Sequence, residues 1–256
     1  MKSESKSWQR FEGKLRSLKQ YLQLMDLSLT LSNKLCNDKK DEEITIGTVL
    51  GATHDSHRQL NNPNLSKEIR RTFISARRQL NEQGFIELHC LFSNYIANII
   101  AEIAHGEPKR LVGILGNKDT RTIKFAEIIH LGSYEAVINE MAKRVFRILE
   151  NLRSTSDMMK KLIKITGITI DKALLEEALI YVEVRHLIIH NDSFVDDPFI
   201  LNDKNKSVPL NGKKLALTYT STNKATNTIY KLCKKIDEEL IKKGLIPIRP
   251  QLPARQ

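Results

Sequence analysis

The sequence predicts an all-α protein, and three observations favour this fold class. The chain has only 11 glycines and 7 prolines in 256 residues, whereas a β-sandwich or barrel needs a turn residue every few positions. Apolar residues recur at three- and four-residue steps over long stretches, which is the spacing of one face of a helix. Finally, 41 % of the residues are hydrophobic, which is enough to fill a core and argues against wholesale disorder.

The N-terminal part is expected to form one long helix over residues 8–36. Its apolar stripe consists of Trp8, Phe11, Leu15, Leu18, Leu22, Met25 and Leu29. The polar run 37–41 ends this helix, and residues 44–50 are either a short strand or the start of another helix. Residues 52–64 are rich in Asn, His and Asp and include a proline, so they are expected to form a loop.

Two helical stretches, divided near Gly84, are expected from residue 65 onward. The second stretch, 85–104, is apolar over most of its circumference, so we expect it to be the buried centre of a bundle. Gly106 and Pro108 end it. The first stretch has a basic side opposite its apolar stripe, formed by Lys67, Arg70, Arg71, Arg77 and Arg78.

The helices that follow include two with recognisable N-caps. Ser133 is expected to cap a helix that reaches residue 152, and Asp171 a helix that runs to His190. An Asn211-Gly212 turn and a short extended segment predict a hairpin-like stretch in the irregular connection 191–220. The remaining helices are expected over 108–115, 121–131, 156–165 and 221–243.

These elements predict one all-helical domain over residues 1–246, followed by a flexible tail at 247–256. Within the domain, residues 1–60 form an N-terminal helical part and residues 61–246 form the core. The tail contains prolines that cannot continue a helix.

The charge balance favours a polyanionic partner. The chain carries 41 Lys and Arg against 30 Asp and Glu, a formal net charge of +11, which raises the local concentration of polyanions. Only 6 % of residues are aromatic, so a base-stacking platform has little support. The basic side chains of Arg70, Arg71, Arg77 and Arg78 are either a solvated face or the first candidates for contact with an RNA backbone.

Cysteine usage and hydropathy predict a cytoplasmic protein. The three cysteines are far apart and include no CxxC pair, so neither a disulfide framework nor a cysteine zinc site is indicated. No apolar stretch reaches the ~18–20 residues that span a bilayer. The polar N-terminus lacks the apolar middle of a signal peptide.

Function is expected to centre on the segment 185–191, which reads Arg-His-Leu-Ile-Ile-His-Asn. On a helical wheel Arg185 lies in line with the apolar Tyr181, whereas His186 and His190 share the neighbouring face. A guanidinium rooted in a core-facing stripe must find an anion or carbonyl groups, because an unpaired buried charge is costly.

An arginine, a polar residue, three apolar residues and then histidine-asparagine, late in a helix of an all-α protein, resembles the signature of the HEPN superfamily. The likeness is strongest over residues 171–243. It implies a helical bundle that dimerises so that two copies of the motif meet. It also implies a metal-independent endoribonuclease that needs no cofactor, with Arg185 and His190 as the catalytic pair and His186 and Asn191 as supporting or substrate-contacting groups.

The resemblance further implies cleavage of RNA that leaves a 2′,3′-cyclic phosphate. It implies a role as a toxin or antiviral-defence effector, with an antitoxin or another defence protein as a partner. In many relatives an acidic residue follows the central phenylalanine of the long apolar helix. Here Ser93 follows Phe92, so no acidic partner is carried over.

The chemistry of these residue types suits that activity. A neutral imidazole, with an ordinary pKa near ~6.5, can take the proton from a ribose 2′-hydroxyl. A guanidinium can hold phosphate oxygens as charge builds in the transition state. On an ideal helix Arg185 and His190 lie ~140° apart, so one chain cannot easily present both side chains to one phosphate, whereas two chains can.

Other interpretations of the same residues stay open. Arg185 can clamp a carboxylate, and the chain can be a non-catalytic helical module that binds a partner protein or a nucleotide. His186 and His190 are four residues apart, a spacing that suits zinc, but no third ligand lies at usable spacing. His54 and His57 fall in the predicted loop, where histidines are usually solvated.

Overall fold

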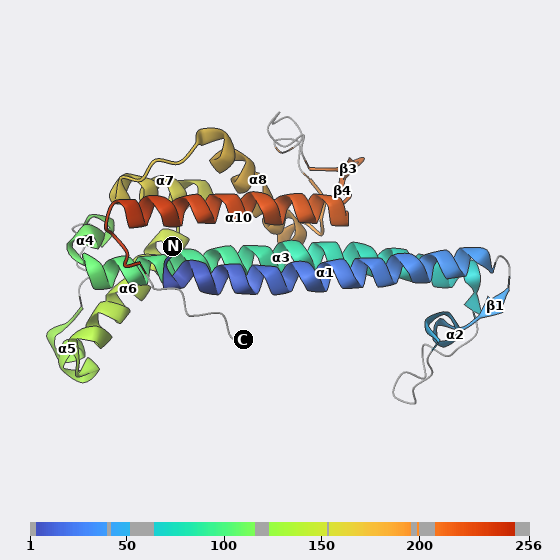
Figure 1. Ribbon diagram of the computed structural model, residues 1–256, viewed down its shortest axis with the longest axis horizontal. Helices are drawn as coiled ribbons and strands as arrows, with labels where there is room; N and C mark the ends of the chain where they lie inside the picture. Colours follow the sequence, from blue (N-terminus) through green and yellow to red (C-terminus); the bar gives the residue numbers. More distant parts are fainter. Residues whose placement is uncertain are drawn as a thin grey trace. The chain divides into compact units, whose positions relative to one another are not determined.

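The computed structural model, whose helices and strands are labelled in Figure 1, divides into two compact units, each of which is considered by itself. The residues that it describes are 4–39, 42–51, 64–115, 123–152, 154–195, 199 and 208–248. Unit 1 takes its residues from 1–16, 88–186 and 225–256. Unit 2 takes its residues from 17–87 and 187–224.

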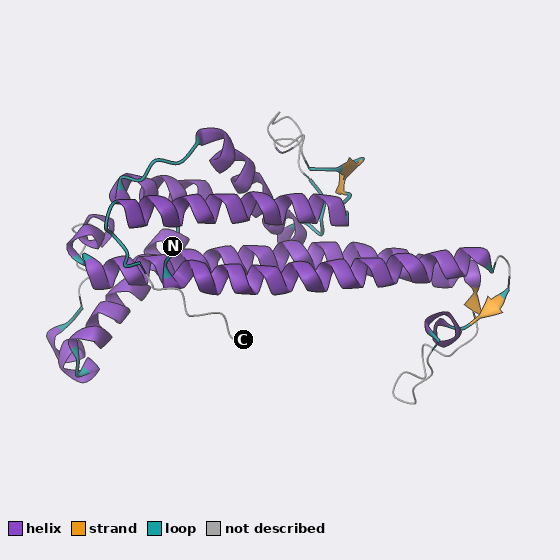
Figure 2. Cartoon of the chain, in the orientation of Figure 1, coloured by secondary structure: helices purple, strands orange, loops and turns teal. Residues whose placement is uncertain are grey.

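The described part of the chain is mostly helical (Figure 2), which confirms the all-α class. Its helices are α1 (Lys6–Asp38), α2 (Ile46–Leu50), α3 (Ser66–Gly106), α4 (Lys109–Leu115), α5 (Phe125–Leu131), α6 (Tyr134–Glu150), α7 (Thr155–Thr166), α8 (Lys172–His190) and α10 (Tyr219–Lys242). None of these helices is both long and apolar enough to cross a membrane. The last eight residues of the predicted tail, 249–256, lie outside the described residues.

Two short antiparallel strand pairs complete the described structure. Strand β1 (Glu43–Ile44) pairs with β2 (Asn64–Leu65), and β3 (Leu210–Asn211) pairs with β4 (Lys214–Leu215). The β3–β4 pair confirms the predicted hairpin between the last two helices. At 44–50 both alternatives occur in turn, because Ile44 ends a strand and α2 begins at Ile46.

The predicted N-caps are confirmed. The side chain of Ser133 accepts a hydrogen bond from Ala136 N at 3.2 Å, and Asp171 Oδ1 accepts one from Leu174 N at 2.8 Å. These bonds satisfy amide groups that have no partner inside the helix.

The predicted division near Gly84 is wrong, because α3 runs without a break from Ser66 to Gly106. A Cβ atom at Gly84 would lie 3.1 Å from both Cδ atoms of Leu22 and 3.1 Å from Cγ2 of Thr222. Glycine therefore serves close packing of α3 against α1 and the start of α10 in unit 2. Its helix-propensity cost, about 1 kcal/mol, does not end the helix.

Unit 1 has its core around the second half of α3, as the sequence predicts. Phe92, Ile96 and Ile100 are completely buried. The ring of Tyr95 packs at 6.5 Å, edge on, from the ring of Trp8. Its hydroxyl donates to Cys233 O of α10 at 2.7 Å. The start of α1 and the middle of α10 therefore cover this apolar helix.

We expect Gly84→Ala to destabilise the protein by roughly 1 kcal/mol, because overpacking outweighs the gain in helix propensity. Thr222 cannot easily move away, since its hydroxyl lies 3.0 Å from both Asn81 Oδ1 and Thr218 O. Gly13 is the matched control, because nothing lies within 4 Å of a Cβ built there. Gly13→Ala in α1 should stabilise by about 0.5–1 kcal/mol. Urea unfolding measures both, and two changes of the same sign would contradict this role for Gly84.

Unit 1 also buries a carboxylate. Asp237 of α10 accepts hydrogen bonds from Ser5, from N at 3.2 Å and from Oγ. The pKa of Asp237 is raised to about 6, mainly by burial and further by the nearby Glu102. The hydrogen bonds from Ser5 act in the opposite direction. Between about pH 4 and 6 the folded protein therefore keeps a proton on Asp237. The unfolded chain has already released this proton, because the carboxyl group has its ordinary pKa of 3.8 there.

Stability should therefore fall as pH rises between about 4 and 6, because folding must then expel this proton or bury a charge. The loss is on the order of 2–3 kcal/mol. Asp237→Asn should remove most of this slope, and denaturant unfolding at pH 4, 5, 6 and 7 measures it. Parallel pH profiles for the two proteins would show that another group controls stability in this range.

Candidate functional site

On helix α8, the side chain of Arg185 starts from the face that packs into the core of unit 1. Ala178 and Tyr181, which lie in line with Arg185 at helical steps of three and four, are buried. Arg185 itself is half-buried and His186 is exposed. The predicted origin of the arginine stem in a buried stripe is thereby confirmed, and the guanidinium at its end lies at the boundary between core and solvent.

A cavity of about 400 Å³ lies beside Arg185 within unit 1. Much of its wall is polar, although apolar side chains also contribute. Its polar lining comes from α3, α6, α8 and the start of α7: His89, Ser93, Glu150, Ser154, Thr155, Glu183, Arg185 and His186. Within the described part of the chain Arg185 forms no ion pair, so its charge faces a polar cavity rather than a fixed carboxylate.

His89 is a member of this site that the sequence prediction missed. Burial lowers its pKa, and the positive charge of Arg185 lowers the pKa further. Its imidazole is therefore neutral at neutral pH and can accept a proton. A signal was present in the sequence, because His89 and Ser93 are polar, four residues apart and set in an apolar helix. Such a pair marks a face that meets something other than core.

His190 and Asn191 belong to unit 2. His190 is the last residue of α8, and both side chains are exposed. Directly after them the backbone turns through two left-handed residues, Asp192 (φ 49°) and Ser193 (φ 65°), a conformation that non-glycine residues rarely adopt. Ser193 Oγ donates to Glu82 Oε1 at 2.9 Å, which fixes this turn. The four predicted site residues are thus two from each unit.

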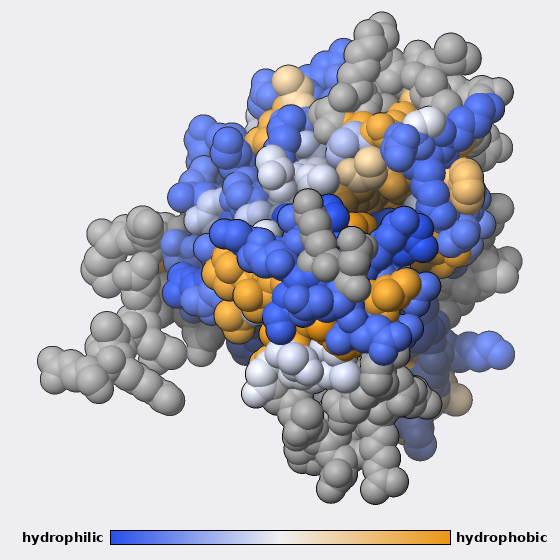
Figure 3. All heavy atoms as spheres, turned by 90° about the vertical axis from the view of Figure 1, so that its right-hand side faces the viewer, coloured by the Kyte–Doolittle hydropathy of each residue, from blue (hydrophilic) through white to orange (hydrophobic). Residues whose placement is uncertain are grey.

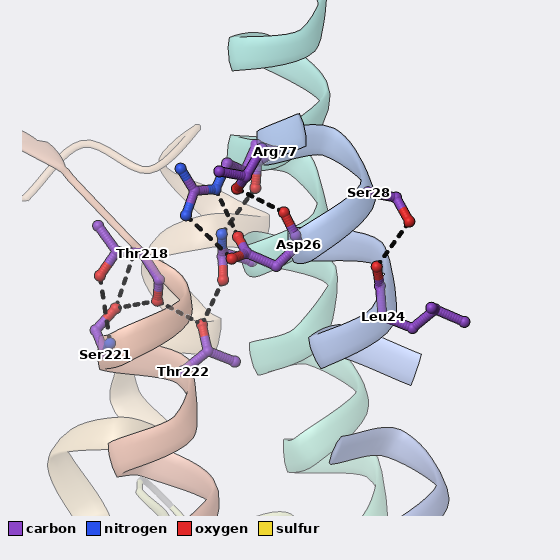
Figure 4. Close-up of polar contacts among 9 residues, drawn as sticks. Leu24, Asp26, Ser28, Arg77, Thr218, Ser221 and Thr222 are labelled. Atoms are coloured by element: carbon purple, nitrogen blue, oxygen red, sulfur yellow. Dashed lines mark hydrogen bonds and ion pairs between the residues drawn. The ribbon is translucent and has the colours of Figure 1, made fainter. Parts of the chain in front are cut away.

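The predicted RNA-contacting arginines differ in how they are held. Arg70 and Arg71 are exposed, and Arg70 Nη1 donates to Asn37 Oδ1 at 3.0 Å. Arg77 is instead paired through two bonds with Asp26, from Nε at 2.5 Å and from Nη2 at 3.0 Å (Figure 4). This pairing raises the pKa of Arg77, so its first role is to join α3 to α1.

Arg77, Arg78 and Lys214 line a second cavity, of about 380 Å³, within unit 2. The ion pairs of the latter two are loose, because Arg78 lies 3.9 Å from Glu82 and Lys214 lies 3.9 Å from Asp192. Apolar side chains also line this cavity, among them Leu29, Phe73, Leu215 and Leu217.

Comparison with known proteins assigns neither a family nor a function to this chain. Neither a family model, nor a curated protein, nor a solved structure matches the chain. Among the described residues no three His, Cys, Asp or Glu side chains gather as metal ligands. His54 and His57 lie outside those residues.

We expect Arg185→Gln to raise the pKa of His89, because one of the two causes that depress it disappears. A pH titration of the histidine resonances by NMR measures this shift. Arg71→Gln, on an exposed residue of unit 2, is the control and should leave the His89 titration in place. An unchanged His89 pKa in Arg185→Gln would show that the charge of Arg185 does not influence the titration of His89.

Proposed function

We propose that this protein is a metal-independent endoribonuclease that acts as a dimer, as a toxin or antiviral-defence effector with a HEPN-like helical bundle. The observation that carries the proposal is the cavity in unit 1. The half-buried Arg185 lines this cavity together with His89 and His186. A cation that holds phosphate and an imidazole that moves a proton are the two groups that this cleavage requires.

The proposed reaction begins when an imidazole takes the proton from a ribose 2′-hydroxyl. The 2′-oxygen attacks the neighbouring phosphorus, and the guanidinium of Arg185 stabilises the charge on the phosphate oxygens. The bond to the 5′-oxygen breaks, and that oxygen takes a proton from an imidazolium. The products are a 2′,3′-cyclic phosphate and a 5′-hydroxyl.

Two imidazoles can serve as the base. His190 fits the HEPN-like motif, and in our proposal it comes from the second chain, because it lies ~140° from Arg185 around an ideal helix. His89 belongs to the same unit as Arg185 and has a lowered pKa. We assign His190 as the base or acid, His186 and Asn191 as substrate-contacting groups, and His89 as the second proton-transfer candidate.

The net charge of +11 supports contact with the RNA backbone. Of the four arginines predicted for this contact, Arg70, Arg71 and Arg78 are exposed. Arg77 has two of its donors occupied by Asp26. We therefore propose the first three as the backbone contacts, with binding that weakens as salt rises.

The test is incubation of the purified chain with total RNA in EDTA. Arg185→Ala and His190→Ala should each lower the cleavage rate by ~100-fold or more, which is the usual contribution of such groups. His130→Ala, which removes an exposed histidine of α5, is the matched control and should cleave like the wild type. His89→Ala, measured beside them, shows which imidazole transfers the proton.

Product chemistry provides a second readout. Fragments should end in a 2′,3′-cyclic phosphate, and a strand with a 2′-deoxyribose at the cleaved position should stay intact. Cleavage that stops in EDTA, or that proceeds equally on DNA, would reject the mechanism. Intact RNA with every variant and with the wild type favours the non-catalytic, partner-binding module.

A further inference from the structure

Helix α1 has a second apolar face, which is largely exposed in the described part of the chain. Five large apolar side chains on it are each between 51 % and 63 % exposed. They are Tyr21, Leu24, Leu27, Leu31 and Leu35, which we call the leucine stripe. All five belong to unit 2.

The leucine stripe is one continuous surface. At 100° per residue its members fall within an arc of about 120°, well away from the face that carries the buried Leu22 and Cys36. The other residues on this arc between Ser17 and Leu35 are uncharged: Ser17, Gln20 and Ser28.

A helix face that meets only water is normally rich in charge. The protein surface drawn in Figure 3, seen from one end, is largely hydrophilic with apolar side chains in patches. An uncharged face of four leucines and a tyrosine is therefore unusual here, and contiguous exposed apolar surface marks an interaction site.

We propose that the occupant of the leucine stripe is the leucine stripe of a second copy of this chain, with the two α1 helices antiparallel. The steps between successive members are three, three, four and four residues. Reversing the helix about the point between Leu27 and Ser28 exchanges three-residue for four-residue steps, and both keep a side chain on the same face. Leu24 then lies opposite Leu31 of the second copy, Leu27 lies one residue from its own equivalent, and Tyr21 lies one residue from the position opposite Leu35.

Charge favours the antiparallel arrangement over the parallel one. Lys19 and Lys34 flank the stripe. In a parallel, in-register pair each lysine would face its own equivalent, which is repulsive. In the antiparallel pair Lys34 falls opposite Tyr21 and Lys19 opposite Cys36, so no lysine faces a lysine.

The area is sufficient for a dimer of modest affinity. Five large side chains that are half exposed remove on the order of 500 Å² per copy, or roughly 1,000 Å² in total, which is near the lower limit of specific interfaces. We therefore expect dissociation in the micromolar range. This inference goes beyond the proposed ribonuclease and uses none of its site residues.

The oligomeric state of the full chain tests the proposal. Sedimentation velocity between 1 and 100 µM should show a monomer–dimer equilibrium for the wild type. Leu24→Glu with Leu31→Glu should raise the dissociation constant at least ~100-fold, since each change places a charge in an apolar contact. Both leucines are exposed in the single chain, so circular dichroism should stay unchanged. Ile129→Glu, on α5 and 65 % exposed, is the matched control and should dimerise like the wild type.

Cysteine crosslinking tests the direction of the helices. In a Cys90→Ser background, which removes the exposed native thiol, Leu27→Cys should form a disulfide-linked dimer on mild oxidation. Leu35→Cys should not, because its equivalents lie far apart in the antiparallel pair.

Three outcomes would overturn the proposal: a wild type that is monomeric at 100 µM, a dimer that survives the double glutamate variant, or equal crosslinking at both cysteines. Assaying RNA cleavage on the same preparations keeps the two proposals distinct. A dimer that the double glutamate variant breaks but that cleaves no RNA supports the leucine stripe and removes the ribonuclease, whereas a dimer that cleaves RNA and survives the double glutamate variant does the reverse.

Discussion

Unit 1 depends on one constraint, which is that α3 is apolar over most of its circumference from Leu88 to Ala104 and that this apolar surface must be covered. The completely buried Ile99 and Ile103 show that this cover is achieved. Because the cover comes from elements far apart in the sequence, they are drawn to one helix. His89 lies at the start of this buried stretch, so the same packing that builds the core sets an imidazole beside Arg185.

Local rules predicted much of the fold. Ser133 and Asp171 cap helices because a short polar side chain just before a helix can accept a hydrogen bond from a backbone N–H that has no partner within the helix. The start of the Arg185 stem in a buried stripe followed from helical phase alone. The continuity of α3 through Gly84 could not be predicted that way. Neither could the place of His89 beside the cavity that Arg185 lines, although the spacing of His89 and Ser93 marks a polar face on α3. Both depend on which helices approach each other, and that is a property of tertiary packing rather than of the local sequence.

The electrostatics of the site have a direction that suits proton transfer. Burial lowers the pKa of His89 and the positive charge of Arg185 lowers it further, which keeps the imidazole neutral. A phosphate held by Arg185 would offset that charge, and the imidazole would then become a stronger base. By linkage, a proton on His89 and an anion in the cavity favour each other. Within our proposal, substrate binding itself therefore prepares the base for its task.

Both of our proposals involve two copies of the chain, and they rest on features with no residue in common. The proposed ribonuclease site needs two copies because Arg185 and His190 lie ~140° apart around an ideal helix, so one chain cannot easily present both side chains to one phosphate. The proposed leucine-stripe dimer needs two copies because the spacing of the stripe is almost the same in both directions along α1, which suits pairing with an identical antiparallel helix. Its exposed area is also near the lower limit of specific interfaces. Since one feature concerns chemistry and the other concerns apolar surface, either can fail alone.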